Sequence, residues 1–260
     1  MDIITFIETH LGFFLLVFAR ISAIFSSAPF FGSRNVPVYV KAAFSLLLTY
    51  ITVPIIPNPA AVPDAFLPYL VLLVSELLVG LIIGFAASLV FYGVQMAGQL
   101  LDMQIGFGIV NIFDPLSGQQ MPLIGNFKYI LALIVFLTTN SHHLFITALV
   151  SSFKLIPPAG IVFSNSVTGI IVDMVSGLFV VAIKICLPVL IAIILTDIAL
   201  GILARTMPQM NIFIVGIPGK IMVGMFVLTL ALPFYILFLE VAFNAMYADI
   251  YHLLAVFSGT

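Results

Sequence analysis

Residues 69–95 read YLVLLVSELLVGLIIGFAASLVFYGVQ and carry a single charged side chain, that of Glu76. A helix that crosses the hydrocarbon core of a bilayer needs roughly 20 mostly apolar residues, and this stretch is longer than that. Proline, which ends helices, is absent from the whole of 69–114. The sequence therefore predicts one unusually long apolar helix here.

The rest of the chain has the same character. Of its 260 residues 63% are hydrophobic and 7% are charged, and the mean hydropathy is +1.32. Soluble domains contain about 25% charged residues, so this composition excludes an ordinary soluble protein. With no internal repeat or composition shift, we expect one domain over 1–260, an all-α polytopic helical membrane protein with about six hydrophobic helical segments. Besides 69–95 these segments are 11–31, 40–56, 127–150, 166–195 and 211–240.

Several of these segments contain charged residues that lipid would not accommodate. A charge at mid-bilayer costs about 2.5–3.5 kcal/mol, and Arg20 has long apolar stretches on both sides. Asp173 and Lys184 are eleven residues apart, which is about three helical turns and places both on one face. We expect these side chains, together with Arg205, to contact other protein subunits, although snorkelling toward the interface is the alternative.

The 80–84 stretch, GLIIG, is a GxxxG pattern inside the long apolar helix. Small residues at this spacing let two helices approach closely in a membrane. Glycine is common in such helices, so chance occurrence is the alternative. We interpret Gly80 and Gly84 as a subunit-packing face.

Residues 105–122 have the most unusual pattern of the chain. Gln95, Gln99 and Asp102 form a polar stripe just before this segment. The apolar run that follows is too short to span a bilayer, and its two glycines disfavour a continuous helix. Irregular backbone at membrane depth is tolerated only inside protein or beside a water-filled cavity. The segment is thus a candidate pore plug or a loop that packs at the surface. The candidate plug residues are Gly106, Phe107, Gly108, Ile109, Val110, Asn111, Ile112 and Phe113.

Enzymatic motifs are missing from the sequence. It contains no HExxH, CxxC or GxSxG pattern, and its one cysteine, Cys186, gives no disulfide framework. The formal net charge of −2 gives no basic patch for nucleic acid. We therefore expect neither catalysis nor a cofactor.

Three motifs together resemble the FliR family, the export-gate proteins of the bacterial flagellar type III secretion system. They are PFFGSRNVP at 29–37, the segment that begins GQLLDMQIGFG at 98–108 and ends MPLIGNF at 121–127, and ARTMPQMNIFIVGIPGK at 204–220. The resemblance covers essentially the whole chain. It is specific because the three motifs occur together and in order.

The resemblance implies a non-enzymatic subunit that assembles with FliP and FliQ into a helical export gate. It further implies contact with FlhB and FlhA, unfolded flagellar proteins as substrates, and a place in the flagellar basal body at the bacterial inner membrane. The loop that corresponds to 105–122 is the pore plug of that gate. Buried among subunits, some apolar segments need not cross the bilayer.

Two alternatives stay open at this point. A homologous virulence injectisome subunit would share the same motifs. A stand-alone secondary transporter would need broken helices and polar midplane residues in both halves of the chain. The second half offers Asp173, Lys184 and Asp197, but the first half offers little beyond Glu76.

Overall fold

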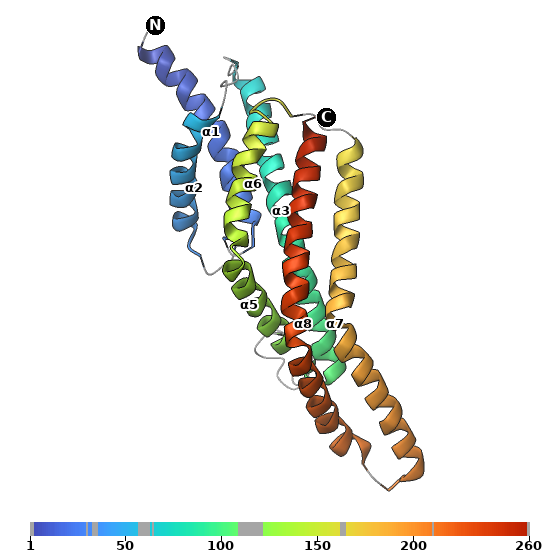
Figure 1. Cartoon of the computed structure of the whole chain (residues 1–260). Helices are drawn as coiled ribbons and strands as arrows, with labels where there is room; N and C mark the ends of the chain where they lie inside the picture. Colours follow the sequence, from blue (N-terminus) through green and yellow to red (C-terminus); the bar gives the residue numbers. More distant parts are fainter. Residues whose placement is uncertain are drawn as a thin grey trace. The chain divides into compact units, whose positions relative to one another are not determined.

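A computed structural model describes residues 3–29, 31–32, 36–56, 63, 65–108, 122–161, 165–209 and 211–258. These residues form seven α-helices and one short 3₁₀ helix, with no strand among them (Figure 1). The helices are α1 (Ile3–Ser27), α2 (Val38–Thr52), η1 (Val53–Ile55), α3 (Phe66–Ile105), α5 (Leu123–Thr138), α6 (Ser141–Leu155), α7 (Asn165–Thr206) and α8 (Ile212–Phe257). The all-α prediction is confirmed.

Each of the six expected hydrophobic segments coincides with a helix or helix pair: α1, α2, α3, the pair α5 and α6, α7 and α8. In the described part of the chain, four segments are long and apolar enough to cross a membrane, and the pair α5 and α6 makes a fifth if it counts as one broken span. These four segments are Val38–Ile55, Phe66–Ile105, Ser166–Thr206 and Ile214–Phe257. The segment expected over 127–150 is divided into α5 and α6, because Asn140 adopts a left-handed backbone with φ 56°.

The chain groups into two compact units. The first comprises Met1–Leu89, Asn140–Val175 and Asn244–Thr260, and the second comprises Val90–Thr139 and Ser176–Phe243. The helices α3, α7 and α8 contribute residues to both units. The expectation of one domain over 1–260 stays a prediction.

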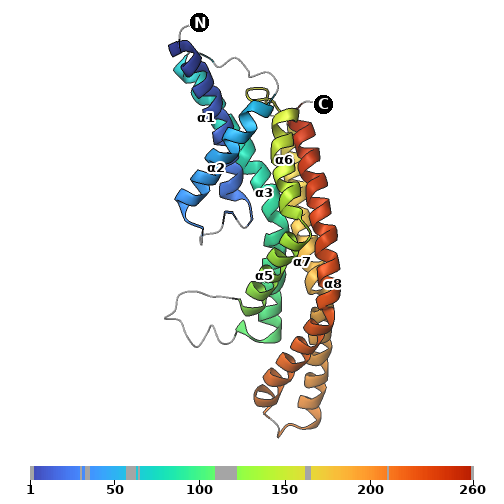
Figure 2. The ribbon, with the colours of Figure 1, turned by 60° about the vertical axis from the view of Figure 1, so that its left-hand side comes forward.

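In the first unit, α1 packs against α2 and against the first part of α3, and α2 follows α1 closely in Figure 2. The ring of Phe25 contacts those of Phe31 and Phe44, with centroids 4.7 and 5.4 Å away. The contact between α1 and α3 depends on glycine. A Cβ on Gly80 would lie 2.4 Å from the carbonyl oxygen of Arg20, so the two backbones touch.

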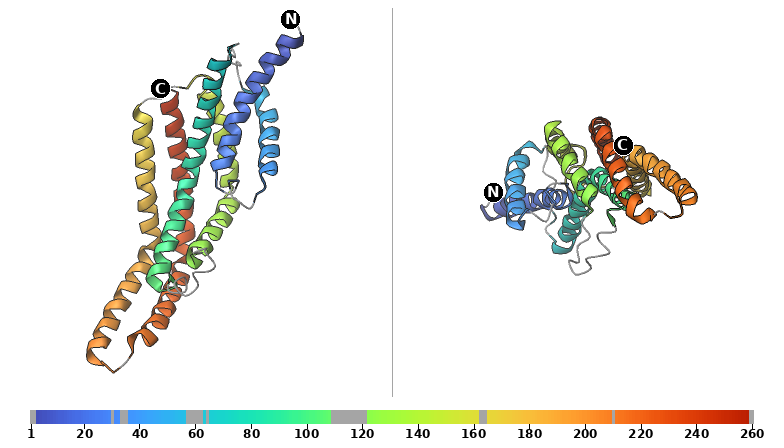
Figure 3. Two further views of the ribbon diagram at one scale, coloured as in Figure 1. Left: turned by 180° about the vertical axis from the view of Figure 1, so that it is seen from behind. Right: turned by 90° about the horizontal axis from the view of Figure 1, so that it is seen from below.

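In the second unit, the end of α3 packs with α5, α7 and α8, and Figure 3 shows α7 and α8 side by side. An aromatic cluster forms its core, where the Phe91 ring lies 5.5 Å from Phe136 and 5.4 Å from Phe243. The three rings come from α3, α5 and α8, so burial of this cluster joins three helices that are distant in sequence.

The three longest helices exceed the thickness of a bilayer. α3, α7 and α8 contain 40, 42 and 46 residues, which is about 60, 63 and 69 Å at 1.5 Å per residue. The hydrocarbon core is about 30 Å thick. Large apolar side chains are nevertheless exposed near both ends of α3, including Leu67 and Met103. One bilayer therefore cannot cover all of this apolar surface.

Candidate functional site

Asp102 links the end of α3 to the start of α5, on either side of segment 105–122. Its carboxylate is 4% exposed and accepts hydrogen bonds from the backbone N–H groups of Ile124, at 3.0 Å, and Gly125, at 3.1 Å. The first N–H groups of a helix have no partner within it, and negative charge is favourable at that end. Asp102 therefore caps α5 from a neighbouring helix.

A close glycine contact holds the same two helices together. A Cβ on Gly98 would lie only 2.1 Å from the Cα of Gly125, so the backbones of α3 and α5 are in direct contact. Nearby, the buried side chain of Ile105 occupies the space that a Cβ on Gly224 of α8 would need, 2.8 Å away. We call Gly98, Asp102 and Gly125 the loop stem, because they hold the two ends of segment 105–122 close together.

The predicted plug begins where α3 ends. Gly106 has φ +107°, a conformation that side chains disfavour, and it terminates the helix after Ile105. Phe107 and Gly108 are half-buried. The other candidate plug residues, 109–113, lie outside the described residues. The structure thus describes the stem and the first plug residues, and the plug itself stays a prediction.

A second polar site lies in the first unit. Arg20 and Glu76 are both 0% exposed, and Arg20 Nε donates to Glu76 Oε2 at 2.5 Å. Arg20 Nη1 also donates to the carbonyl oxygens of Ser152, at 3.1 Å, and Ile156, at 2.9 Å. The second carboxylate oxygen of Glu76 accepts the N–H of Ala159 at 3.2 Å. This network ties together α1, α3, α6 and the turn that follows α6.

The sequence predicts that Arg20 contacts another protein subunit. Within this chain, Glu76 supplies its counter-charge, and the Phe153 ring lies 4.5 Å from the guanidinium carbon. Likewise, Gly80 and Gly84 pack closely on α1 of their own chain. A further role of these residues in subunit packing stays a prediction.

The remaining packing candidates lie on the surface. Asp173 and Lys184 both belong to α7, and both side chains are exposed. Arg205 is exposed in the last turn of α7, where positive charge is favourable next to the free carbonyl groups. Their expected contacts with other subunits stay predictions.

No sequence pattern indicated that Lys128 is buried. This residue follows the 121–127 motif directly, yet its side chain is only 3% exposed within α5. The hydroxyl of Tyr235, in α8, donates a hydrogen bond to the carbonyl oxygen of Lys128 at 2.8 Å. A helical-face pattern alone could not have revealed this contact, since the two residues are 107 positions apart.

Residues 11–246 match the family described as bacterial export proteins, family 1. The flagellar biosynthetic protein FliR of Bacillus subtilis is 40% identical over 221 residues, which cover 83% of this chain and 84% of that protein. The chain belongs to the FliR family.

Other FliR-family relatives match over most of their length. FliR of Escherichia coli is 30% identical over 91% of this chain and 88% of its own. FliR of Pectobacterium carotovorum is 32% identical over 90% of this chain and 89% of its own. The resemblance drawn from the three sequence motifs is thereby confirmed. Membership of the FliR family and the long apolar helices make this chain a multi-pass membrane component of a bacterial export apparatus.

Proposed function

We propose that this chain is a subunit of the flagellar type III export gate at the bacterial inner membrane. In this proposal it assembles with FliP and FliQ in the basal body, FlhB and FlhA contact the gate, and unfolded flagellar proteins pass through it. The chain forms part of the conduit, supplies its plug and has no enzymatic activity. The flagellar names of its relatives favour this role over a virulence injectisome.

The observation that carries the proposal is the mismatch between helix length and membrane thickness. α3, α7 and α8 expose large apolar side chains along lengths about twice that of the hydrocarbon core. Exposed apolar surface of this extent is typical of protein interfaces. Neighbouring subunits of a large complex can cover what lipid cannot reach.

The geometry of the loop stem favours the hypothesis that segment 105–122 is a pore plug. Asp102 and the contact between Gly98 and Gly125 hold both ends of segment 105–122 in one place. A loop with fixed ends can leave and re-enter a pore without rearranging the helices that carry it. The left-handed backbone of Gly106 provides a pivot directly after α3.

Affinity purification of the tagged full-length chain in mild detergent tests the assembly. We expect FliP and FliQ to be recovered with it in a fixed ratio, because its exposed apolar faces need protein partners. Recovery of the chain alone would contradict the proposal. If that isolated chain also moved a solute against a gradient in liposomes, the result would favour a stand-alone secondary transporter.

Membrane conductance tests the plug. We expect deletion of 106–112, or replacement of Phe107 and Phe113 by Ala, to make resting cells leak ions, because the apolar stopper is lost. Phe127→Ala is the matched control, since this exposed phenylalanine lies in α5 outside the segment. Unchanged conductance and secretion in the deletion strain would refute the plug.

A further inference from the structure

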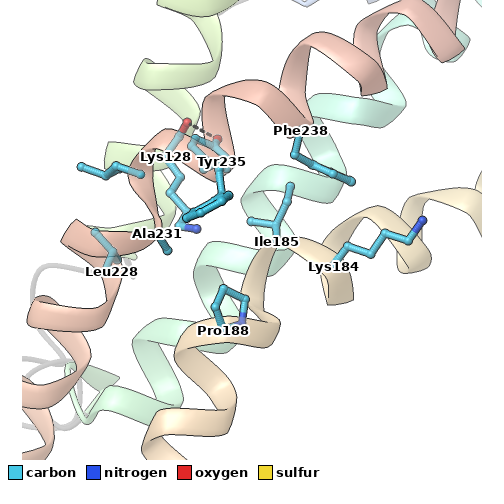
Figure 4. A pocket seen from close by; sticks show the side chains of 10 residues that line it. Lys128, Lys184, Ile185, Pro188, Leu228, Ala231, Tyr235 and Phe238 are labelled. Carbon is cyan, nitrogen blue, oxygen red and sulfur yellow. Dashed lines mark hydrogen bonds between the residues drawn. The ribbon is translucent and has the colours of Figure 1, made fainter.

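A cavity of about 200 Å³ lies among α5, α7 and α8 in the second unit. Lys128 and Tyr235 line it together with the apolar side chains of Ile185, Leu228 and Phe238. Figure 4 shows the ammonium group of Lys128 directed into this space beside the Tyr235 ring. The cavity therefore combines apolar walls with one buried positive charge.

The position of Lys128 is fixed by its neighbours. The Lys128 Nζ lies 4.6 Å from the centre of the Tyr235 ring, and the Tyr235 hydroxyl donates to the carbonyl oxygen of Lys128 at 2.8 Å. Tyr235 is itself buried, so both ends of this arrangement are held in the core. The ammonium is thus presented to the cavity in one orientation and does not reach bulk solvent.

No carboxylate in the described part of the chain neutralises Lys128. The two ion pairs found there are Arg20 with Glu76 and Lys220 with Asp197. A cation–π contact offsets only part of the free energy that it costs to bury an ion. The buried cation of Arg20, by contrast, is compensated by Glu76 of the same chain. The cost of burying the Lys128 charge is therefore not fully compensated within the described part of the chain, and an anion in the cavity would compensate it.

The geometry points to a carboxylate from another protein subunit. We propose that the cavity receives one Asp or Glu side chain from an apolar helix of a neighbouring subunit, an inference that rests on the proposed function. A single ammonium matches a single carboxylate, because the ammonium of the other lining lysine, Lys184, points away from Lys128 in Figure 4. The apolar walls suit an aliphatic stem, and the adjacent exposed Phe234 and Leu230 of α8 suit the rest of that helix.

Zero-length coupling tests the proposal directly. A carbodiimide joins an amine to a carboxylate only where the two are in contact, so we expect the assembled complex to yield an amide between Lys128 and an acidic residue of another polypeptide. Lys128→Arg, which keeps the charge but cannot couple, is the control. An amide to an acidic residue of this same chain, or none in an intact complex, would overturn the proposal. So would an anionic lipid that mass spectrometry finds on the native complex but not on Lys128→Gln.

Charge reversal provides the second test. We expect Lys128→Glu to lower recovery of the other subunits at least about tenfold, because two buried carboxylates would then face each other. Lys154→Glu, at an exposed lysine near the end of α6, should leave recovery unchanged. Suppressor mutations that change an acidic residue of another subunit to lysine should restore recovery of that subunit with Lys128→Glu.

These outcomes separate the two proposals. Suppose that the Lys128→Glu chain is present in membranes at the normal level and still recovers the other subunits undiminished. That result would overturn the carboxylate site and leave the proposed function intact. Recovery of the unaltered chain without any other export protein would instead contradict the proposed function itself. Lys128→Met, which fits an apolar cavity without introducing negative charge, checks that loss of recovery is not a failure to fold; its level in membranes should match that of the unaltered chain.

Discussion

Glu76→Gln removes the counter-charge of Arg20 with almost no change in shape. Both side chains are fully buried, and Arg20 would keep its hydrogen bonds to the carbonyl oxygens of Ser152 and Ile156. Removing one partner of a buried ion pair costs about 3–5 kcal/mol because the other charge stays desolvated. The retained hydrogen bonds favour the lower end, so we expect a loss of about 3 kcal/mol in the free energy of unfolding.

The double replacement of Arg20 by Met and Glu76 by Leu removes both charges together. It leaves the carbonyl of Ile156 and the N–H of Ala159 without these partners, while the Ser152 carbonyl still accepts from the N–H of Ile156 at 2.9 Å. Replacing a buried pair by apolar residues is often neutral. We therefore expect the double variant to lose less than the sum of the Arg20→Met and Glu76→Leu losses by about 2–3 kcal/mol.

Unfolding of the purified full-length chain in mixed micelles measures these effects, with helicity followed as the fraction of SDS rises. Asp197→Asn is the control, because its ion pair with Lys220 is partly exposed and should contribute at most about 1 kcal/mol. A loss below about 1 kcal/mol for Glu76→Gln, or additive losses in the double variant, would refute the idea that this pair is a coupled buried network.

Three further predictions use the same unfolding measurement or a simple thiol assay. Gly80→Ala should destabilise the chain by about 1–3 kcal/mol, because its Cβ would clash with the backbone of α1, whereas Gly177→Ala, with open space around it, should stabilise α7 by up to about 1 kcal/mol. An opposite order would contradict the helix contact. Asp102→Ala should cost about 1–2 kcal/mol through loss of the α5 cap, and an unchanged midpoint would argue against that cap. The buried thiol of Cys186 should react with a maleimide only after unfolding, so rapid labelling of the native chain would show that its packing is open.

The long helix could be predicted from the sequence because its signals are local. Residues 69–95 contain no proline and one charge, and α3 indeed continues from Phe66 to Ile105. The break at Asn140 was harder to predict, since the hydropathy of 127–150 is high on both sides of a short polar turn. Local composition thus identifies helices well and locates a backbone break poorly.

The partners of polar residues could not be predicted, because they depend on contacts between distant segments. Glu76 lies 56 positions from Arg20, and Ile124 lies 22 positions from Asp102. The polar stripe that ends at Asp102 was visible, but its role as a cap for α5 requires the helices to be in place. Lys128 is the clearest case, since a lysine beside a loop motif is usually solvated, and only tertiary packing buries it.

In the proposed assembly, protein subunits, and not lipid alone, cover the apolar faces of the longest helices. Leu67 and Met103 are both exposed on α3 and are 36 residues apart, near its two ends. A photo-reactive amino acid placed at each position in living cells would record what covers it. We predict that at least one of the two positions crosslinks to another protein of the export apparatus. Adducts with lipid alone at both positions would contradict this account.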